Sequence, residues 1–468
     1  MKLDGRSRLF TAPAIAAALS WVACSTGDVE SPDGGTGPSA DATTSSCPAP
    51  TGAGTMHQSP RASETWTAAG SPHIVDNALS ILTGITVTIE ACATVELADT
   101  VEIVVDGQLR ALGEAGRPVT FKPKDPSKKW GQITATRTAV KPAIELRHAI
   151  LEGGGNVQAA DLEVAQMIFV RAAGGTTGQE MIFVEDVELR GSASSGISLL
   201  DAATFAAGST GLRITGSASA PVVLNGFALT NLPDGSYRGN ANDQILITTG
   251  ERLGVSDVAA TVVMHKRDVP YRVGIFGNIV TLTLGAPTGS AITSLQIEPG
   301  TTLLFKPGFV LFVASVNGAS SGEIIAQGTA AEPITFSSAA ATPAAGDWRG
   351  ILFYAPPTAA TVFDHVRFAF AGNQATETNG FSCGTPPSAS PRDIVGALMF
   401  ATDRPVTRQI LTNSVIEDSG SNGVDRGWLG DPVDYLPTNQ FTRIAYCTQT
   451  FPKPAVGLCP DPPPCPTE

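Results

Sequence analysis

The sequence is poor in charge and in aromatic residues. Only 16% of its 468 residues are charged and 6% are aromatic, and 43 acidic residues outnumber 30 basic ones. Folded chains usually carry about 25% charged residues, whereas disordered chains are richer in charge and poorer in apolar residues. With 42% hydrophobic residues, the chain is therefore expected to fold. The shortage of Lys and Arg argues against a nucleic-acid partner, which requires a basic surface.

Sequence signatures of several catalytic and metal-binding classes are also missing. The chain has no CxxC, no Asp-Asp pair, no Gly-Gly-x-Gly-x-Asp calcium-binding repeat and no polygalacturonase-like set of motifs. A P-loop, a dinucleotide fingerprint and a Ser-His-Asp order are missing as well. We therefore predict no catalytic residues, no cofactor and no metal site, and we interpret the protein as a non-enzyme.

An apolar run of fifteen uncharged residues, 9–23, follows a short basic segment at the N-terminus. It is too short to span a bilayer, which takes about 20 residues, and it fits a cleaved secretory signal. The run ends in Trp21-Val22-Ala23-Cys24, which resembles a bacterial lipobox. The resemblance implies that residues 1–23 are removed and that Cys24 carries lipid. Trp21 departs from the Leu or Val usual at this position, and ordinary signal-peptidase cleavage is the alternative.

The segment after Cys24 is predicted to be a flexible tether. Residues 24–50 are rich in Gly, Ser, Thr, Pro and Asp, with almost nothing apolar. A tether next to a lipidated Cys would hold a folded body away from a membrane. Ser25, rather than Asp, follows the Cys, and by resemblance to the enterobacterial sorting rule this favours the outer membrane. The expected location is the cell envelope, with the membrane as a partner and the body surface-exposed.

Six further cysteines follow Cys24, an even number that suggests three disulfides in an exported chain. Fifteen pairings are possible. Proximity in the sequence favours Cys47–Cys92, Cys383–Cys447 and Cys459–Cys465. A zinc site is the alternative, but no His lies near the C-terminal cysteines.

The body of the chain shows strand periodicity and an internal repeat of about 25 residues. Short β-branched runs, such as Ile85–Ile89 and Val101–Val105, alternate with Gly, Asn, Asp and Ser turns. The segment from Glu188 resembles the segment from Arg213, and both contain Gly-Ser-Ala-Ser at the same place. A repeat of this length predicts one coil of a parallel β-solenoid, in which like residues stack. The low aromatic count predicts a narrow aliphatic interior.

A longer repeat divides the body into two related halves. Pro118-Val-Thr-Phe matches Pro333-Ile-Thr-Phe, Trp130-Gly-Gln-Ile matches Trp348-Arg-Gly-Ile, and His148 matches His365, all in the same order. These motifs resemble the right-handed parallel β-helix of bacterial surface lipoproteins, of the kind found in myxobacteria. The resemblance covers roughly residues 70–425 and implies the fold, but it does not imply an activity.

We therefore predict an all-β protein, a right-handed parallel β-helix in two related halves. The predicted parts are a lipoprotein signal peptide (1–23), the tether (24–50), a first β-helix half with an N-terminal cap (51–260), a second half (261–425), and a C-terminal cap with a Pro- and Cys-rich tail (426–468).

Five groups of residues are candidates for function, and each has a structural alternative that we favour. The paired histidines are expected at coil corners. The Glu185-Asp186 and Glu417-Asp418 pairs are expected on outer faces. The tryptophans could stack on sugars but are expected to pack inside, and the two basic clusters are expected to be solvated. These groups are His148 and His365; Glu185, Asp186, Glu417 and Asp418; Trp130 and Trp348; Lys122, Lys124, Lys128 and Lys129; and His265, Lys266, Arg267 and Asp268.

The favoured function is a non-enzymatic cell-surface lipoprotein, acting as an adhesin or envelope scaffold, with a polysaccharide or another envelope protein as partner. The first alternative is a polysaccharide-active lyase or hydrolase, which would use titratable residues along one groove of the solenoid. The second alternative is an assembly or secretion component, which would present a large apolar patch to a protein partner.

Overall fold

The computed structural model describes residues 46–136, 140–157, 165–175, 177–248, 252–253, 260–274, 281–286, 288, 291–373, 382–383, 394–402, 404–430, 433–452 and 465. The chain divides into two units, Met1–Thr44 and Ser45–Glu468, and the described residues belong to the second. Cys24, the expected lipidation site, lies outside the described residues.

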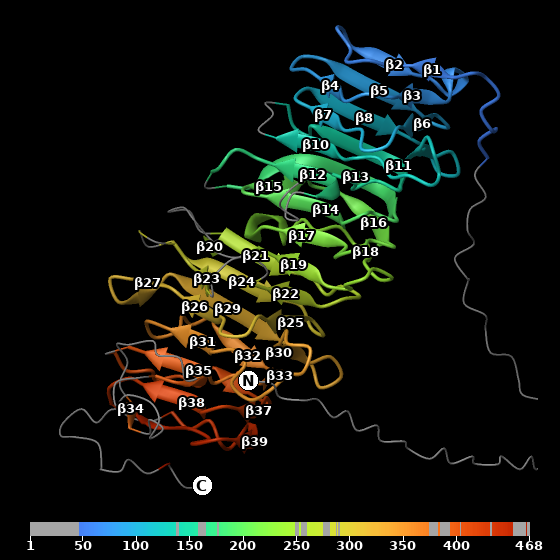
Figure 1. Cartoon of the computed structure of the whole chain (residues 1–468). Coiled ribbons are helices and arrows are strands. Elements are labelled where there is room, and N and C mark those ends of the chain that lie inside the picture. Colours follow the sequence, from blue (N-terminus) through green and yellow to red (C-terminus); the bar gives the residue numbers. More distant parts are fainter. Residues whose placement is uncertain are drawn as a thin grey trace, which may run out of the picture. The chain divides into compact units, whose positions relative to one another are not determined.

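The second unit is a parallel β-solenoid, which confirms the predicted fold class. Successive strands return to the same faces and pair in parallel with the coil before them (Figure 1). In the described part of the chain, the remaining regular elements are two short 3-10 turns, η1 (Ala68–Gly70) and η3 (Gly226–Ala228).

One sheet of thirteen strands, here called the long sheet, continues through both halves. Its strands are β4 (Leu79–Ile81), β7 (Ile103–Val105), β10 (Ile133–Thr136), β12 (Gln166–Arg171), β14 (Ser195–Leu200), β17 (Val222–Leu224), β19 (Ile245–Ile247), β22 (Tyr271–Val273), β25 (Thr302–Phe305), β30 (Ile334–Ser338), β33 (Val366–Ala369), β37 (Val415–Ser419) and β39 (Gln440–Ile444).

A twelve-stranded sheet covers the other two faces of the first half. Two of its ladders, β2–β5–β8 and β1–β3–β6–β9, join at β11, which pairs with both. Its strands are β1 (Thr55–Met56), β2 (Glu64–Trp66), β3 (His73–Val75), β5 (Thr86–Glu90), β6 (Thr94–Leu97), β8 (Gln108–Leu112), β9 (Val119–Pro123), β11 (Ile144–Glu152), β13 (Gln179–Arg190), β15 (Ala203–Phe205), β16 (Thr210–Thr215) and β18 (Gly235–Ser236).

Two new parallel sheets replace it in the second half. The six-stranded sheet contains β20 (Arg252–Leu253), β23 (Thr281–Leu284), β26 (Val310–Val313), β31 (Gly350–Phe353), β35 (Gly396–Ala401) and β38 (Asn422–Gly427). The five-stranded sheet contains β21 (Ala260–Met264), β24 (Thr293–Ile297), β29 (Gly322–Gln327), β32 (Val362–Asp364) and β36 (Leu411–Thr412). Two antiparallel pairs lie outside the coils: β27 (Ser315–Val316) with β28 (Ala319–Ser320), and β34 (Ser382–Cys383) with β40 (Phe451–Pro452).

The strand register confirms the short repeat. Glu188 lies directly opposite Arg213 in the β13–β16 ladder, as the 25-residue spacing predicts. The two Gly-Ser corners meet as well, because the backbone N–H of Ala218 donates to the carbonyl of Ser192 at 3.0 Å. One repeat is therefore one coil.

The long repeat does not keep to one face of the solenoid. Strand β9 begins after Pro118 in the twelve-stranded sheet, but β30, after Pro333, belongs to the long sheet. Trp130 precedes β10 of the long sheet, whereas Trp348 precedes β31 of the six-stranded sheet. The motifs of the second half are thus displaced by one face. The long sheet stays continuous across this change, while the other faces begin again.

The interior is mainly aliphatic in the first half, although Trp66, Phe121 and Phe205 are buried there, and it is richer in stacked aromatic rings in the second half. Val87, Leu109, Ile144 and Ile182 form one buried row across consecutive coils. Beyond residue 300 the rows contain stacked rings, including Phe336 and Phe368 with centroids 5.1 Å apart. The expectation of an aliphatic interior throughout is therefore wrong. The few aromatic residues are concentrated inside the later coils.

The disulfides confirm one predicted pairing and correct two. Cys47 is bonded to Cys92, with a Cα–Cα distance of 5.2 Å, and this joins the segment before β1 to the turn after β5. Cys447 is bonded to Cys465, which excludes the predicted partners of both residues. The tail returns to the last coil instead of closing a small loop on itself. Cys383 is also disulfide-bonded, and Cys459 lies outside the described residues.

Candidate functional site

The paired histidines are corner residues, as their repeat positions predict. His148 and His365 have φ angles of 42° and 50°, in the left-handed region that side chains with local polar partners tolerate best. The Nδ1 atom of His148 lies 3.5 Å from Oδ2 of Asp186, and that of His365 lies 3.0 Å from Oδ2 of Asp364. Their recurrence therefore reflects the geometry of a coil corner.

Three of the four residues in the repeated acidic pairs contact arginines, whereas Asp186 lies beside His148. Arg147 contacts Glu185, and Arg367 contacts Glu417. Arg443 donates from Nε to Oδ1 of Asp418 at 2.5 Å, and this hydrogen bond lowers the pKa of that carboxyl. Within the described ranges, no group of three or more His, Cys, Asp and Glu side chains is arranged to hold a metal ion.

Both repeat tryptophans are fully buried, which confirms the packing interpretation and excludes stacking on a surface sugar. The indole Nε1 of Trp130 donates to the carbonyl of Glu152 at 2.7 Å, and that of Trp348 donates to the carbonyl of Ala369 at 2.9 Å. The two residues thus make the same bond to the next coil.

The lysine-rich loop is not an unpaired basic patch. Three of its lysines lie within 4 Å of a carboxylate in the twelve-stranded sheet or in one of its turns. The fourth, Lys129, donates to the carbonyl of Gly191. These pairs are Lys122–Glu96 at 3.3 Å, Lys124–Asp76 at 2.7 Å and Lys128–Asp99 at 3.8 Å. Their charge is largely neutralised locally, so the loop offers little attraction to an anionic surface.

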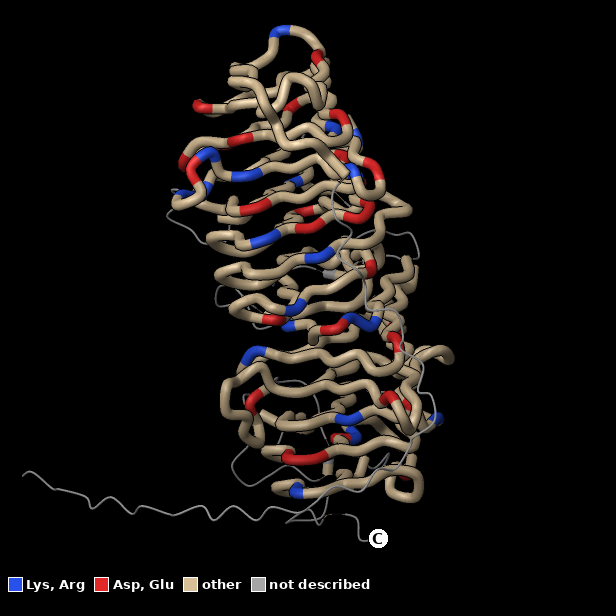
Figure 2. Tube along the Cα trace, turned by 90° about the vertical axis from the view of Figure 1, so that its right-hand side faces the viewer, with Lys and Arg blue, Asp and Glu red and all other residues tan. Residues whose placement is uncertain are grey.

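Interleaved charges continue along the outer face of the first half (Figure 2). Glu145 accepts from Nε of Arg110 at 2.7 Å and from Nε of Arg147 at 2.8 Å. Burial disfavours the charged carboxylate, but these two hydrogen bonds outweigh it and lower the pKa of Glu145. Arg147 also lies over the ring of Phe183, 4.4 Å from its centroid. These charged groups are therefore paired with one another.

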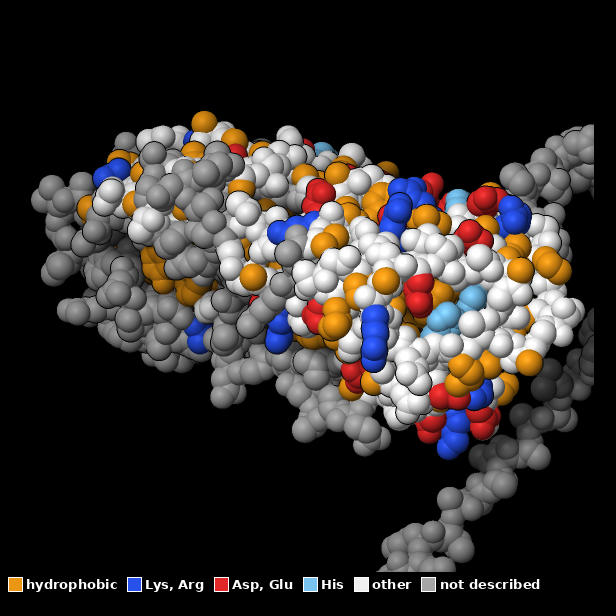
Figure 3. All heavy atoms as spheres, turned by 90° about the horizontal axis from the view of Figure 1, so that it is seen from above, with side chains coloured by type: hydrophobic (Ala, Val, Ile, Leu, Met, Phe, Trp, Pro, Cys, Tyr) orange, Lys and Arg blue, Asp and Glu red, His pale blue; other side chains and the backbone are white. Residues whose placement is uncertain are grey.

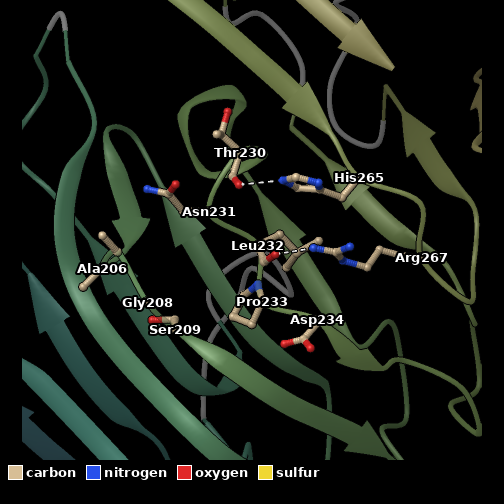
Figure 4. A pocket seen from close by; sticks show the side chains of 11 residues that line it. Ala206, Gly208, Ser209, Thr230, Asn231, Leu232, Pro233, Asp234, His265 and Arg267 are labelled. Atoms are coloured by element: carbon tan, nitrogen blue, oxygen red, sulfur yellow. Dashed lines mark hydrogen bonds between the residues drawn. The ribbon is translucent and has the colours of Figure 1, made fainter. Parts of the chain in front are cut away.

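The remaining candidate cluster, 265–268, borders a surface pocket of about 340 Å³. Three segments that are far apart in the sequence form the pocket: the turn before β16, the turn before β18 and the loop between β21 and β22 (Figure 4). Its lining residues are Ala206, Ala207, Gly208, Ser209, Thr230, Asn231, Leu232, Pro233, Asp234, His265 and Arg267. The sequence identified only the last segment, because nothing in its pattern shows which turns stack beside it.

The side chains of the cluster are held in different ways. His265 Nδ1 lies 2.8 Å from Oε1 of Glu298, and its Nε2 lies 3.1 Å from the carbonyl oxygen of Thr230. Lys266 and Asp268 are not among the lining residues, and Asp268 accepts from the hydroxyl of Ser236 at 2.8 Å. Only His265 and Arg267 of the predicted cluster line the pocket.

Arg267 does not use all of its hydrogen-bond donors within the protein. Its Nη1 donates to the carbonyl of Lys266 at 3.0 Å and its Nη2 donates to the carbonyl of Leu232. Its Nε is buried and has no hydrogen-bond partner. No carboxylate in the described part of the chain forms a salt bridge within 4 Å of this guanidinium. The charge of Arg267 still acts on the carboxyls of Asp234 and Glu298 and helps to lower the pKa of both.

Asp234 is the one carboxylate among the described lining residues, and it is fixed in its ionised form. Its Oδ1 accepts from the hydroxyl of Thr210 at 2.6 Å and from the backbone N–H of Gly211 at 3.0 Å. The Thr210 hydrogen bond, followed by that of Gly211, lowers the pKa of Asp234. An ionised carboxylate that already accepts two hydrogen bonds is poorly suited to act as a general acid.

A second polar cluster, which the sequence analysis missed, lies at the N-terminal end of the solenoid. His57 and His73 lie side by side against the indole of Trp66, and pale blue histidine side chains are visible on this end in Figure 3. Burial lowers the pKa of both imidazoles, and for His57 the neighbouring His73 lowers it further. The register brings them together, since β1 pairs with β3 through Thr55 and His73. The two histidines are 16 residues apart, and no sequence pattern indicates that they are in contact.

Searches with protein-family models, with curated proteins and with solved structures find no match to this chain. Among the described residues, no helix is long and apolar enough to cross a membrane.

Proposed function

We propose that this protein is a non-enzymatic, lipid-anchored scaffold of the bacterial cell envelope whose solenoid binds an acidic polysaccharide. The observation that carries the proposal is the guanidinium of Arg267 at the pocket, which forms no salt bridge within 4 Å among the described residues. A sugar carboxylate supplies the salt-bridge partner that this guanidinium lacks.

The other lining groups suit the rest of a sugar ring. Ser209 and Thr230 accept backbone N–H bonds through their hydroxyl oxygens, from Val184 at 3.2 Å and from Val263 at 3.0 Å, which leaves each hydroxyl hydrogen to donate. The amide of Asn231 donates to the carbonyl of Phe205 at 3.2 Å, and its oxygen remains an acceptor. These groups stand on stacked coils, which hold them in place without a ligand.

The envelope location rests on the N-terminal sequence. A short basic segment, an uncharged apolar run, Cys24 and a polar tether occur in the order expected of an exported lipoprotein. The Cys47–Cys92 and Cys447–Cys465 disulfides are compatible with export, because disulfides persist in oxidising compartments.

Replacing Arg267 by Ala is expected to weaken binding of an acidic polysaccharide, such as polygalacturonate or alginate, by at least about tenfold, because a charge-assisted hydrogen bond contributes roughly 1.5–3 kcal/mol. The full chain would be titrated with these polymers and with neutral dextran by calorimetry. Arg238→Ala is the matched control, since Arg238 is 69% exposed and lies 3.7 Å from Asp268 outside the pocket.

Three results would contradict the binding proposal. They are equal loss of affinity in both variants, equal affinity for dextran, and no binding at all. New reducing or unsaturated ends in the same incubations would instead establish the polysaccharide-active alternative.

Replacing Cys24 by Ser is expected to abolish lipid attachment, since an alcohol does not replace the acylated thiol. In cells fed an alkyne fatty acid, the wild-type chain should become labelled and fractionate with membranes, whereas Cys24→Ser should do neither. Cys47→Ser, which removes a disulfide but leaves Cys24, is the control and should keep its label. Labelling that survives in Cys24→Ser would refute the anchor.

A further inference from the structure

Two imidazoles face each other at the N-terminal end of the solenoid. His57 follows β1 and His73 opens β3, and the two strands pair in parallel. The Nε2 atom of His57 lies 2.8 Å from Nδ1 of His73. His73 is only 3% exposed, and the ring of His57 lies 4.1 Å from that of Trp66, which is 1% exposed.

Each ring is held from its other side by an oxygen that can only accept. His57 Nδ1 lies 3.3 Å from Oε1 of Glu64, and His73 Nε2 lies 2.8 Å from the carbonyl oxygen of Thr67. The Glu64 carboxylate is itself oriented, because it accepts from the indole Nε1 of Trp66 at 2.7 Å. The outer nitrogen of His73 therefore carries hydrogen, and Glu64 offers an acceptor to a hydrogen on the outer nitrogen of His57 when its inner nitrogen binds a metal ion.

This arrangement brings the two inner nitrogens within hydrogen-bond distance of each other. In a neutral imidazole only one nitrogen carries hydrogen, so the inner nitrogen of His73 is an acceptor and that of His57 donates to it. Burial favours the neutral form of each ring, which is the form that binds a metal ion. A metal ion that replaced this shared hydrogen would meet a lone pair on each inner nitrogen.

We propose that His57 Nε2 and His73 Nδ1 bind a divalent transition-metal ion of the zinc class, with water completing its coordination. Imidazole nitrogen is a preferred ligand of zinc, copper and nickel. Ligating histidines characteristically donate their second N–H to a carboxylate or a carbonyl, which are the roles of Glu64 and Thr67 here. This inference is independent of polysaccharide binding.

The geometry requires only a small adjustment. Zinc–nitrogen distances of about 2.0–2.1 Å in a tetrahedron place two nitrogens about 3.3–3.4 Å apart, so the pair has to open by roughly half an ångström. His57 lies beyond the end of β1, at the edge of its ladder, and among the described strands β1 has a neighbour on one side only. The bound ion would then join the first strand to the coil beneath it.

The test uses the full chain without an affinity tag, stripped with EDTA and titrated with Zn²⁺ by calorimetry and with Co²⁺ by visible absorption. We expect one saturable site per chain, at least about a tenfold loss of affinity in His57→Gln, and a loss in Glu64→Gln as well, because outer partners contribute to metal affinity. Zn²⁺ should also raise the melting temperature of the wild type but not of His57→Gln.

His365→Gln is the matched control, because His365 also places Nδ1 beside a carboxylate but contacts no second imidazole among the described residues. It should bind Zn²⁺ as the wild type does, and circular dichroism should show that each variant is folded. Absence of saturable binding, or unchanged binding in folded His57→Gln, overturns the proposal. A histidine pair that takes up one shared proton and no metal overturns it as well.

Discussion

Replacing Gly235 by Ala is expected to disrupt the coil at the pocket and to destabilise the protein by about 3 kcal/mol or more. Gly235 has φ = 149°, a conformation that residues with a Cβ rarely adopt. A Cβ at this position would lie 1.9 Å from the carbonyl oxygen of Leu212 and 2.9 Å from its nitrogen. Those atoms belong to the backbone of the paired strand β16, so a side-chain movement does not relieve the overlap.

Gly308→Ala separates this overlap from the cost of the backbone angle. Gly308 has φ = 78°, and a Cβ there would have no atom within 4 Å. It should therefore lose only about 1–2 kcal/mol, the cost of the left-handed conformation for a residue with a Cβ. Urea unfolding followed by far-ultraviolet circular dichroism measures both variants. Equal shifts of the two midpoints would show that the contact with Leu212 does not limit position 235.

The position of Gly235 also links stability to the pocket. Asp234 precedes Gly235 and lines the pocket. The backbone carbonyl of Asp234 accepts a hydrogen bond from the backbone N–H of Leu212 at 2.9 Å. Because each coil contacts mainly its neighbours, damage at one coil remains local in a solenoid. Gly235→Ala should therefore weaken polysaccharide binding while the distant His57–His73 pair is unaffected.

The periodic features of the fold were predictable because a solenoid translates sequence spacing directly into stacking. The 25-residue spacing gave the pairing of Glu188 with Arg213, and the repeat position of Trp130 and Trp348 gave their burial. The pairing of Cys47 with Cys92 also followed from their neighbourhood. The first two inferences depend on equivalent positions in the repeat, and the third depends on nearness along the chain.

Features that depend on how coils change along the chain were not predictable in this way. The displacement of the repeat by one face occurs between β18 and β22, where the twelve-stranded sheet ends and two new sheets begin. The pocket containing Arg267 lies at this change and combines three turns with no common motif. The Cys447–Cys465 bond was missed because a Pro-rich tail has no period that fixes where it returns.

The second large effect is expected when Trp348 is replaced by Ala. This substitution should lower the free energy of unfolding by about 3–5 kcal/mol, because it removes a buried ring from a column of rings. The indole is fully buried and stacks on Phe305 with centroids 4.3 Å apart and planes inclined by 10°. It also supplies the hydrogen bond to the carbonyl of Ala369, at 2.9 Å. Loss of the ring thus leaves a cavity and a buried carbonyl without this donor.

Two variants divide this cost into its parts. Trp348→Phe keeps most of the ring contact but removes the donor, and it should lose about 1–3 kcal/mol, the penalty for an unsatisfied buried polar group. Phe451→Ala removes a ring that is 37% exposed and should lose much less than Trp348→Ala. Urea midpoints by circular dichroism decide the order. If Trp348→Ala were no worse than Phe451→Ala, the aromatic column would not be what stabilises the later coils, and the stability of the second half would have to come from its backbone ladders instead.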